Sequence, residues 1–119
     1  MIRIYHNSRC SKSRAALALL EGREVEVVNY LDTPPDAAEL EYLLKLLGIP
    51  ARQLMRSGEA VYKELGLAAP TLDDAALIAA MVAQPILIER PIVIANGKAA
   101  IGRPPENVLA ILQASAGAA

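Results

Sequence analysis

Hydrophobic and polar positions change their spacing several times within the first 30 residues. Residues 2–6 alternate between apolar and polar side chains, which is typical of a half-buried strand. A polar turn over residues 7–11 leads into residues 13–20, which are rich in Ala and Leu and predict a helix. Apolar side chains surround this helix on nearly all sides, so we expect it to be well buried. Valines within residues 25–28 predict a second strand, and the three elements together predict a βαβ unit with parallel strands.

The middle of the chain, about residues 36–83, carries helical patterns and no strand pattern. Leucines at helical spacing predict an amphipathic helix over residues 40–47. Residues 52–66 predict one or two short helical pieces. Thr71 and Asp74 are spaced as a capping box, which predicts that another helix begins there. We therefore expect a helical insertion between two parts of a sheet.

The strand pattern returns near the C-terminus. Residues 86–88 predict a short strand beside a proline. Asn96-Gly97 separates the apolar residues 92–95 from residues 98–101, and this dipeptide strongly favours a two-residue hairpin turn. The order βαβ, helices, ββα predicts an α/β protein with a thioredoxin-like mixed sheet and a helical insertion.

A last helix is predicted to begin at residues 104–106, where two prolines precede a glutamate. Val108, Leu109 and Leu112 are expected to share one apolar side of it. The small residues 114–119 are expected to fray.

Composition narrows the class of protein. The 119 residues predict a single domain, and 54% of them are hydrophobic, which is enough for a core without disulfides or metals. Twelve basic residues nearly balance thirteen acidic ones, which argues against a nucleic-acid or membrane binder. No apolar run approaches the ~20 residues of a membrane span, and the N-terminal residues have no signal-peptide pattern. We expect a cytoplasmic monomer.

Cys10 is the single cysteine of the chain, so neither an internal disulfide nor a thiolate-rich zinc site can form, and no metal is expected. A lone cysteine is most often a small buried apolar residue. Here, however, it stands at the beginning of the first predicted helix, among Arg9, Lys12 and Arg14, with no acidic residue nearby. Backbone N–H groups and the helix dipole at such a place favour a thiolate and a bound anion. Lys12 alone could equally belong to a solvated helix face.

His6, the only histidine, lies shortly before the cysteine. It could stabilise the thiolate or relay a proton, or it could simply pack at the end of the strand. The local sequence leaves these two interpretations open.

Five separated segments carry a recognisable pattern. The first is the loop from His6 to Arg14, and the others are residues 30–35, residues 54–67 (Leu54-Met55-Arg56 and Tyr62 to Leu67), residues 85–93 and residues 102–106. Together they resemble the glutaredoxin-coupled arsenate reductases, or ArsC family, and the resemblance covers about residues 2–112.

The resemblance implies an oxidoreductase in which the Cys10 thiolate attacks arsenate, with His6 helping to keep the thiol ionised. It implies that Arg56, Arg90 and Arg103 surround the oxyanion, and we add Ser13 and Arg14 as oxyanion-binding candidates. No bound cofactor is implied. Glutathione is the expected co-substrate that leaves a mixed disulfide, and glutaredoxin is the expected partner that resolves it.

The chemistry of the residues agrees with this resemblance. An anionic thiolate is repelled by an anionic substrate, and guanidinium groups reduce that repulsion while binding oxygens in pairs. Each taken alone, such arginines are more often surface ion-pair partners. Arg90 and Arg103 both precede a proline, which restricts their backbone to extended conformations. Pro91 is expected to follow a cis peptide bond, as thioredoxin-like folds have beside the reactive cysteine.

Two alternatives remain open. Ser13 stands where redox motifs carry a second cysteine, so a CxxC mechanism is excluded. A glutathione-dependent thiol reductase of the same fold would keep Cys10 but act on another substrate. An Spx-like regulator that binds RNA polymerase would share the fold without the reaction, although many Spx proteins carry the CxxC that is missing here.

Overall fold

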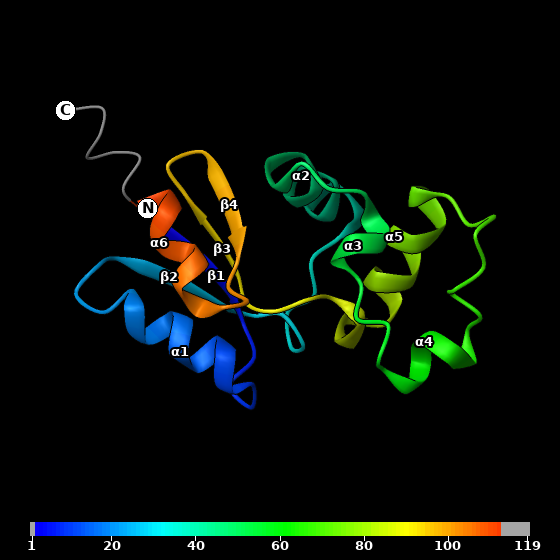
Figure 1. The fold of residues 1–119 in the computed structure, drawn as a ribbon, viewed down its shortest axis with the longest axis horizontal. Coiled ribbons are helices and arrows are strands. Elements are labelled where there is room, and N and C mark those ends of the chain that lie inside the picture. Colours follow the sequence, from blue (N-terminus) through cyan, green and yellow to red (C-terminus); the bar gives the residue numbers. More distant parts are fainter. Residues whose placement is uncertain (1, 113–119) are drawn as a thin grey trace. The chain divides into compact units, whose positions relative to one another are not determined.

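The computed structural model describes residues 2–112 and divides the chain into two compact units (Figure 1). The first unit is made of residues 1–33 together with residues 90–119, and the second is made of residues 34–89. The predicted tail at residues 114–119 lies outside the described residues. The expectation that the chain behaves as one domain stays a prediction.

The first unit is built on a four-stranded mixed sheet. Its strands are β1 (Ile2–His6), β2 (Val25–Asn29), β3 (Ile92–Ala95) and β4 (Lys98–Ile101), in the order β2-β1-β3-β4. β1 and β2 are parallel, whereas β3 is antiparallel to both β1 and β4. Helix α1 (Ser11–Leu19) makes the crossover from β1 to β2. The predicted βαβ unit and hairpin are therefore present with the predicted pairing.

The hairpin turn has the backbone that its sequence predicts. Asn96 and Gly97 have φ angles of 56° and 73°, the left-handed pair that a type I′ turn requires. Asparagine and glycine accept this conformation most readily, so the register of β3 and β4 follows from the dipeptide.

Aliphatic side chains fill the core of the first unit between the sheet and α1. Ala16 of α1 packs with sheet residues such as Ile4 and Val93 and with the C-terminal helices. The expectation of a well-buried α1 is wrong, because only Ser13 and Ala16 of this helix are buried and Leu19 is exposed. The helix lies on one face of the sheet, and a single face of a helix suffices to cover it.

The chain leaves the sheet through a short 3₁₀ segment, η2 (Pro105–Val108), which continues into α6 (Leu109–Leu112). The helix begins at the prolines as predicted, but its apolar side differs. Val108 and Leu112 are buried, whereas Leu109 is exposed and Ile111 is buried instead. A 3₁₀ first turn has three residues per turn, so it rotates the buried side away from ideal helical spacing.

The second unit consists of short helices around leucine and methionine side chains. Its elements are α2 (Ala37–Leu47), α3 (Ala51–Leu54), α4 (Ala60–Glu64), α5 (Asp74–Ala83) and the 3₁₀ segment η1 (Pro85–Leu87). Among the described residues it contains no strand, only an isolated bridge between Met55 and Ile88. None of the helices described in either unit is long and apolar enough to cross a membrane.

Two local predictions for this unit are wrong. α5 is capped by Asp73, whose side chain accepts from the Ala76 N–H, and not by Thr71. Both residue types cap helices well, and the aspartate lies directly before the helix. Residues 85–87 form η1 and not a strand, because Pro85 fits the first turn of a helix and cannot donate to a sheet.

Candidate active site

The loop between β1 and α1 places Cys10 at the N-cap of α1. Its own N–H donates to the Asn7 carbonyl at 3.0 Å, and its carbonyl accepts from the Arg14 N–H at 3.0 Å. The first closes a tight turn and the second begins the helix. Cys10 is half-buried, so its thiol remains within reach of a small ligand. On its other side the thiol meets N–H groups of the first turn of α1.

The pKa of the Cys10 thiol is lowered by its surroundings. Burial alone would raise the pKa, but several groups that stabilise the thiolate outweigh it. These are the backbone N–H groups of Ser13 and Lys12, and the guanidinium of Arg90, which donates to the sulfur and adds its charge. The first turn of α1 and one arginine thus favour the thiolate, which is the form of cysteine that attacks as a nucleophile.

His6 contacts Ser13, and neither its bonds nor its charge act directly on the thiol. Its Nδ1 lies 2.6 Å from Ser13 Oγ, which also accepts the Asn7 N–H at 3.0 Å. All three residues are buried. Burial and the nearby charge of Arg14 lower the pKa of His6 below its ordinary value, so the ring is neutral near pH 7. The hydrogen bonds join the end of β1 to the first turn of α1, which orients the N–H groups that face the thiolate.

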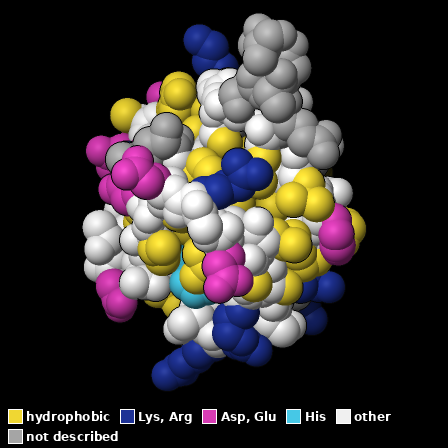
Figure 2. Space-filling model, turned by 90° about the vertical axis from the view of Figure 1, so that its left-hand side faces the viewer, with side chains coloured by type: hydrophobic (Ala, Val, Ile, Leu, Met, Phe, Trp, Pro, Cys, Tyr) yellow, Lys and Arg dark blue, Asp and Glu magenta, His cyan; other side chains and the backbone are white. Residues whose placement is uncertain are grey.

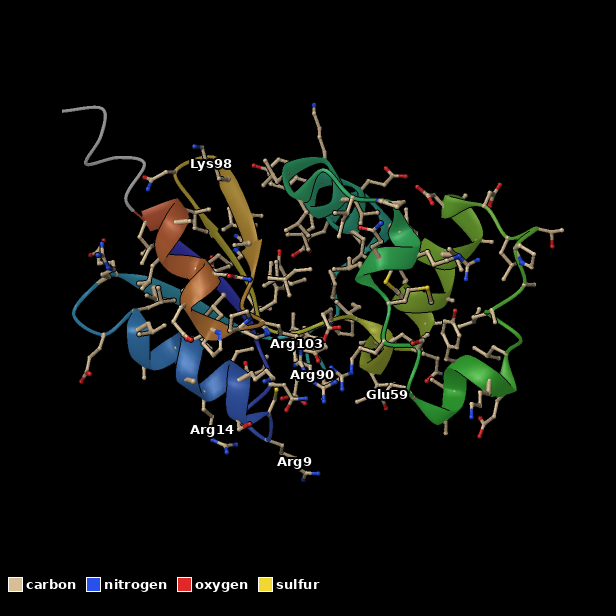
Figure 3. All side chains as sticks on the ribbon, in the orientation of Figure 1. Arg9, Arg14, Glu59, Arg90, Lys98 and Arg103 are labelled. Carbon is tan, nitrogen blue, oxygen red and sulfur yellow. The ribbon has the colours of Figure 1, made fainter. Side chains whose placement is uncertain are left out.

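Arg90 and Arg103 flank the β3–β4 hairpin in sequence and lie close together (Figure 3), and both contact Cys10. Arg103 Nη1 lies 4.0 Å from Cys10 Sγ and donates to the Arg90 carbonyl at 3.1 Å. The peptide bonds that follow both arginines are cis, Arg90–Pro91 as expected and Arg103–Pro104 in addition. Two guanidinium groups therefore lie beside the sulfur.

Gly102 allows Arg90 and Arg103 to lie beside the Cys10 sulfur, a role that was not predicted from the sequence. Its N–H donates to the Pro91 carbonyl at 2.9 Å. A Cβ atom at this position would lie only 2.7 Å from Pro91 Cγ and 3.3 Å from Ala16 Cβ. Glycine is thus required for the backbone before Arg103 to pack against Pro91 and α1. The available signals were a glycine directly after a predicted strand and its place in the family-like segment 102–106.

Arg14 and Arg56 make other contacts. Arg14 Nη1 donates to the Ser8 carbonyl at 2.8 Å, which braces the loop before Cys10. Arg56 belongs to the second unit, where its guanidinium pairs with Glu59 at 3.1 Å and with Glu89 at 2.8 Å. These ion pairs agree with the alternative interpretation of Arg56, in which a lone arginine serves as an ion-pair partner.

Positive charge gathers where α1 begins. Arg9 and Arg14 extend outward from this end of the helix (Figure 3), and Figure 2 shows Lys and Arg side chains collected at the lower end of one face. Among residues 2–112 no group of histidine, cysteine and acidic side chains could hold a metal ion. The positive charge at this end of α1 suits the site to a bound anion and a thiolate.

Comparison with known proteins agrees with this geometry. The sequence model of the ArsC family matches residues 5–111. An arsenate reductase of Neisseria meningitidis serogroup A is 59% identical over 114 residues, covering 93% of this chain and 97% of the relative. The uncharacterized protein YfgD of Escherichia coli K12 is 62% identical over 114 residues, with 93% and 96% coverage. The solved arsenate reductase from Vibrio cholerae superposes with a TM-score of 0.90 at 53% identity, with 92% and 96% coverage.

The fold and the site define a thioredoxin-like protein with a single cysteine at a helix N-terminus, which confirms the predicted fold class. Within that class, the chain belongs to the ArsC family.

Proposed function

We propose that this protein is an arsenate reductase in which Cys10 is the nucleophile. The observation that carries the proposal is the position of the thiol, at the first turn of α1 with Arg90 and Arg103 beside it. The relatives named arsenate reductase support arsenate as the substrate. Any tetrahedral oxyanion would meet the same charges, so the choice of arsenic rests on those relatives.

In the first step the Cys10 thiolate attacks the arsenic atom. A sulfur–arsenic bond forms and one oxygen of arsenate leaves as water after protonation. Arg90 and Arg103 bind oxygens of the substrate and offset the negative charge that accumulates as two anions approach each other. Ser13 and Arg14 hold the loop and the helix N-terminus in place for this attack.

In the second step the glutathione thiolate attacks the sulfur of Cys10. A disulfide forms between the two sulfurs, and the electron pair of the sulfur–arsenic bond stays on arsenic, which is thereby reduced from As(V) to As(III). The two thiols supply the two electrons, and arsenite departs. Because Cys10 is the only cysteine in the chain, the second thiol has to come from another molecule.

Glutaredoxin completes the cycle in this proposal. Its thiolate attacks the glutathione sulfur and Cys10 leaves as a thiolate, so a low pKa of Cys10 also makes it a good leaving group. Arg56 is included as a third oxyanion ligand on the strength of the family resemblance. We place the reaction in the cytoplasm, where glutathione is reduced, and expect a monomer.

The test is a coupled assay containing arsenate, glutathione, glutaredoxin, glutathione reductase and NADPH. We expect arsenate-dependent NADPH oxidation by the wild type and a loss of about 10³-fold or more in Cys10→Ser, because a serine hydroxyl is not ionised at neutral pH. Activity retained in Cys10→Ser would contradict the proposal. Reduction of a glutathione mixed disulfide without arsenate would favour the thiol-reductase alternative.

A further inference from the structure

A cavity of about 310 Å³ lies beside the loop that precedes Cys10. Asn7 and Arg9 line it from the loop, and Asn29 and Asp32 line it from the residues at the end of β2 and after it. β1 and β2 run parallel and end together, so the cavity lies at the carboxyl ends of two neighbouring strands. Ligands of open α/β sheets commonly bind at such an edge. The volume is at the lower end of the range for small-molecule sites, about 300–1,000 Å³.

Asn7 is a buried polar side chain whose amide orientation is set by the loop. It is only 8% exposed, and its Oδ1 accepts the Arg9 N–H at 2.9 Å. Because the carbonyl oxygen of the amide is used in this way, the Nδ2 hydrogens remain as donors for a ligand in the cavity that Asn7 lines. Asn7 Nδ2 is not one of the buried unpartnered polar atoms among the described residues, so the amide group can meet solvent or a ligand.

The charges around the cavity have both signs. Arg9 supplies a guanidinium and Asp32 a carboxylate, and both residues are exposed at the mouth. Leu31 adds an apolar surface that is 43% exposed. An inorganic oxyanion would be repelled by Asp32, so this is no second arsenate site. A short peptide could place a carboxylate against Arg9, an amino group against Asp32 and amides against Asn7 and Asn29.

We propose that this cavity is the subsite for glutathione, the peptide thiol that attacks the Cys10 sulfur. The proposal rests on the function proposed above and deepens it, because it assigns residues to the second substrate. The Cys10 N–H donates to the Asn7 carbonyl at 3.0 Å, so a tight turn joins the cavity wall to the nucleophile. A tripeptide anchored in the cavity would direct its thiol toward the Cys10 sulfur while Arg90 and Arg103 hold the departing arsenite.

The direct test is binding of S-methylglutathione, which has the peptide but no free thiol, to the full chain by titration of its amide NMR signals. We expect the largest shifts at residues 7–9 and 29–32. Asp32→Asn and Arg9→Gln should each weaken binding about five-fold, the loss of one polar contact at an exposed site. Glu24→Gln and Arg23→Gln are matched controls, because they remove the same charges from exposed residues of the first unit that do not line this cavity.

A kinetic test separates this subsite from the arsenate site. Asp32→Asn should raise the KM for glutathione about five-fold and leave both the KM for arsenate and the pH dependence of Cys10 alkylation unchanged. A substitution that disturbed the fold of the first unit would instead change both KM values and the pH dependence of Cys10 alkylation.

The outcomes distinguish this inference from the proposed function. Suppose that the wild type reduces arsenate, and that Asp32→Asn and Arg9→Gln change neither the KM for glutathione nor the binding of S-methylglutathione. This result would overturn the subsite and leave the proposed function standing. Binding that depends on Asp32 and Arg9 in a protein that does not reduce arsenate would support the subsite and overturn the function. No binding of S-methylglutathione at concentrations well above the glutathione KM would overturn the subsite.

Discussion

At the scale of single residues, opposing effects on the Cys10 thiol decide its charge. Partial burial favours the neutral thiol, whereas the N–H groups of Ser13 and Lys12 and the guanidinium of Arg90 favour the thiolate. The position of Cys10 at a helix beginning was visible in the sequence. The family resemblance placed Arg90 at the oxyanion, whereas its effect on the pKa of the Cys10 thiol, from 80 residues away in the sequence, is seen only in the fold.

Replacing Arg90 tests this explanation. Arg90→Ala should raise the pKa of Cys10 toward the ordinary value of about 8.5, because the thiolate loses one charged donor. The pKa is measured from the rate of iodoacetamide alkylation against pH. Lys98→Ala, at the exposed turn end of β4, serves as the control and should leave the profile unchanged. The same pKa in wild type and Arg90→Ala would contradict the explanation.

His6 predicts a pH dependence of stability with a definite sign. Its pKa is lower in the folded chain than in the unfolded chain, so the unfolded state takes up the proton more readily. The neutral ring therefore stabilises the fold fully above about pH 6.5, and this contribution is lost as the pH falls toward the folded pKa.

The expected measurement is urea unfolding between pH 7.5 and 5. The variant His6→Asn keeps a hydrogen-bonding group near the position of Nδ1 but does not titrate. Its free energy of unfolding should therefore lack the decrease at low pH that His6 causes in the wild type. An identical pH dependence in the two proteins would show that His6 does not titrate differently on folding.

At the scale of elements, the close approach of Gly102 to Pro91 and α1 holds the two arginines beside the sulfur. Gly102→Ala should shift this packing, destabilise the protein by about 1–3 kcal/mol as overpacking does, and lower activity more than stability alone explains. Gly58→Ala is the matched control, because a Cβ there meets open space and its φ is not positive. Equal activity in the two variants, assayed well below their unfolding temperatures, would contradict this role.

Most elements could be predicted from local signals, and the errors have local causes. The Asn96-Gly97 hairpin has a turn chemistry with few alternatives. The cap of α5 was misplaced because Thr71 and Asp73 are both good capping residues two positions apart. The exposure of Leu109 and Leu19 depends on where neighbouring elements lie, and a single sequence contains no direct signal of that.

At the scale of the whole molecule, the fold class could be predicted from the sequence, and Arg90 and Arg103 lie beside Cys10 as the resemblance implies, but other features could not be predicted. Asn7 and Gly102 were missed, because a polar loop residue and a glycine have many ordinary explanations. For Arg56 two interpretations were open, an ion-pair partner and the oxyanion ligand that the resemblance implies. The structure shows ion pairs of Arg56 with Glu59 and Glu89 in the second unit. The contacts of Gly102 with Pro91 and of Arg56 with Glu89 join residues that are distant along the chain, and a single sequence does not reveal such pairs.

In the proposed reaction the Cys10 thiolate attacks arsenate, and glutathione then takes the place of arsenic on the same sulfur. This exchange can be tested by intact-mass spectrometry of the protein after anaerobic incubation with arsenate and disulfide-free glutathione but without glutaredoxin. We predict one glutathionyl group per chain, located on Cys10, formed only when arsenate is present and removed by glutaredoxin. No adduct in an arsenate-treated sample, or equal adduct without arsenate, would contradict the claim.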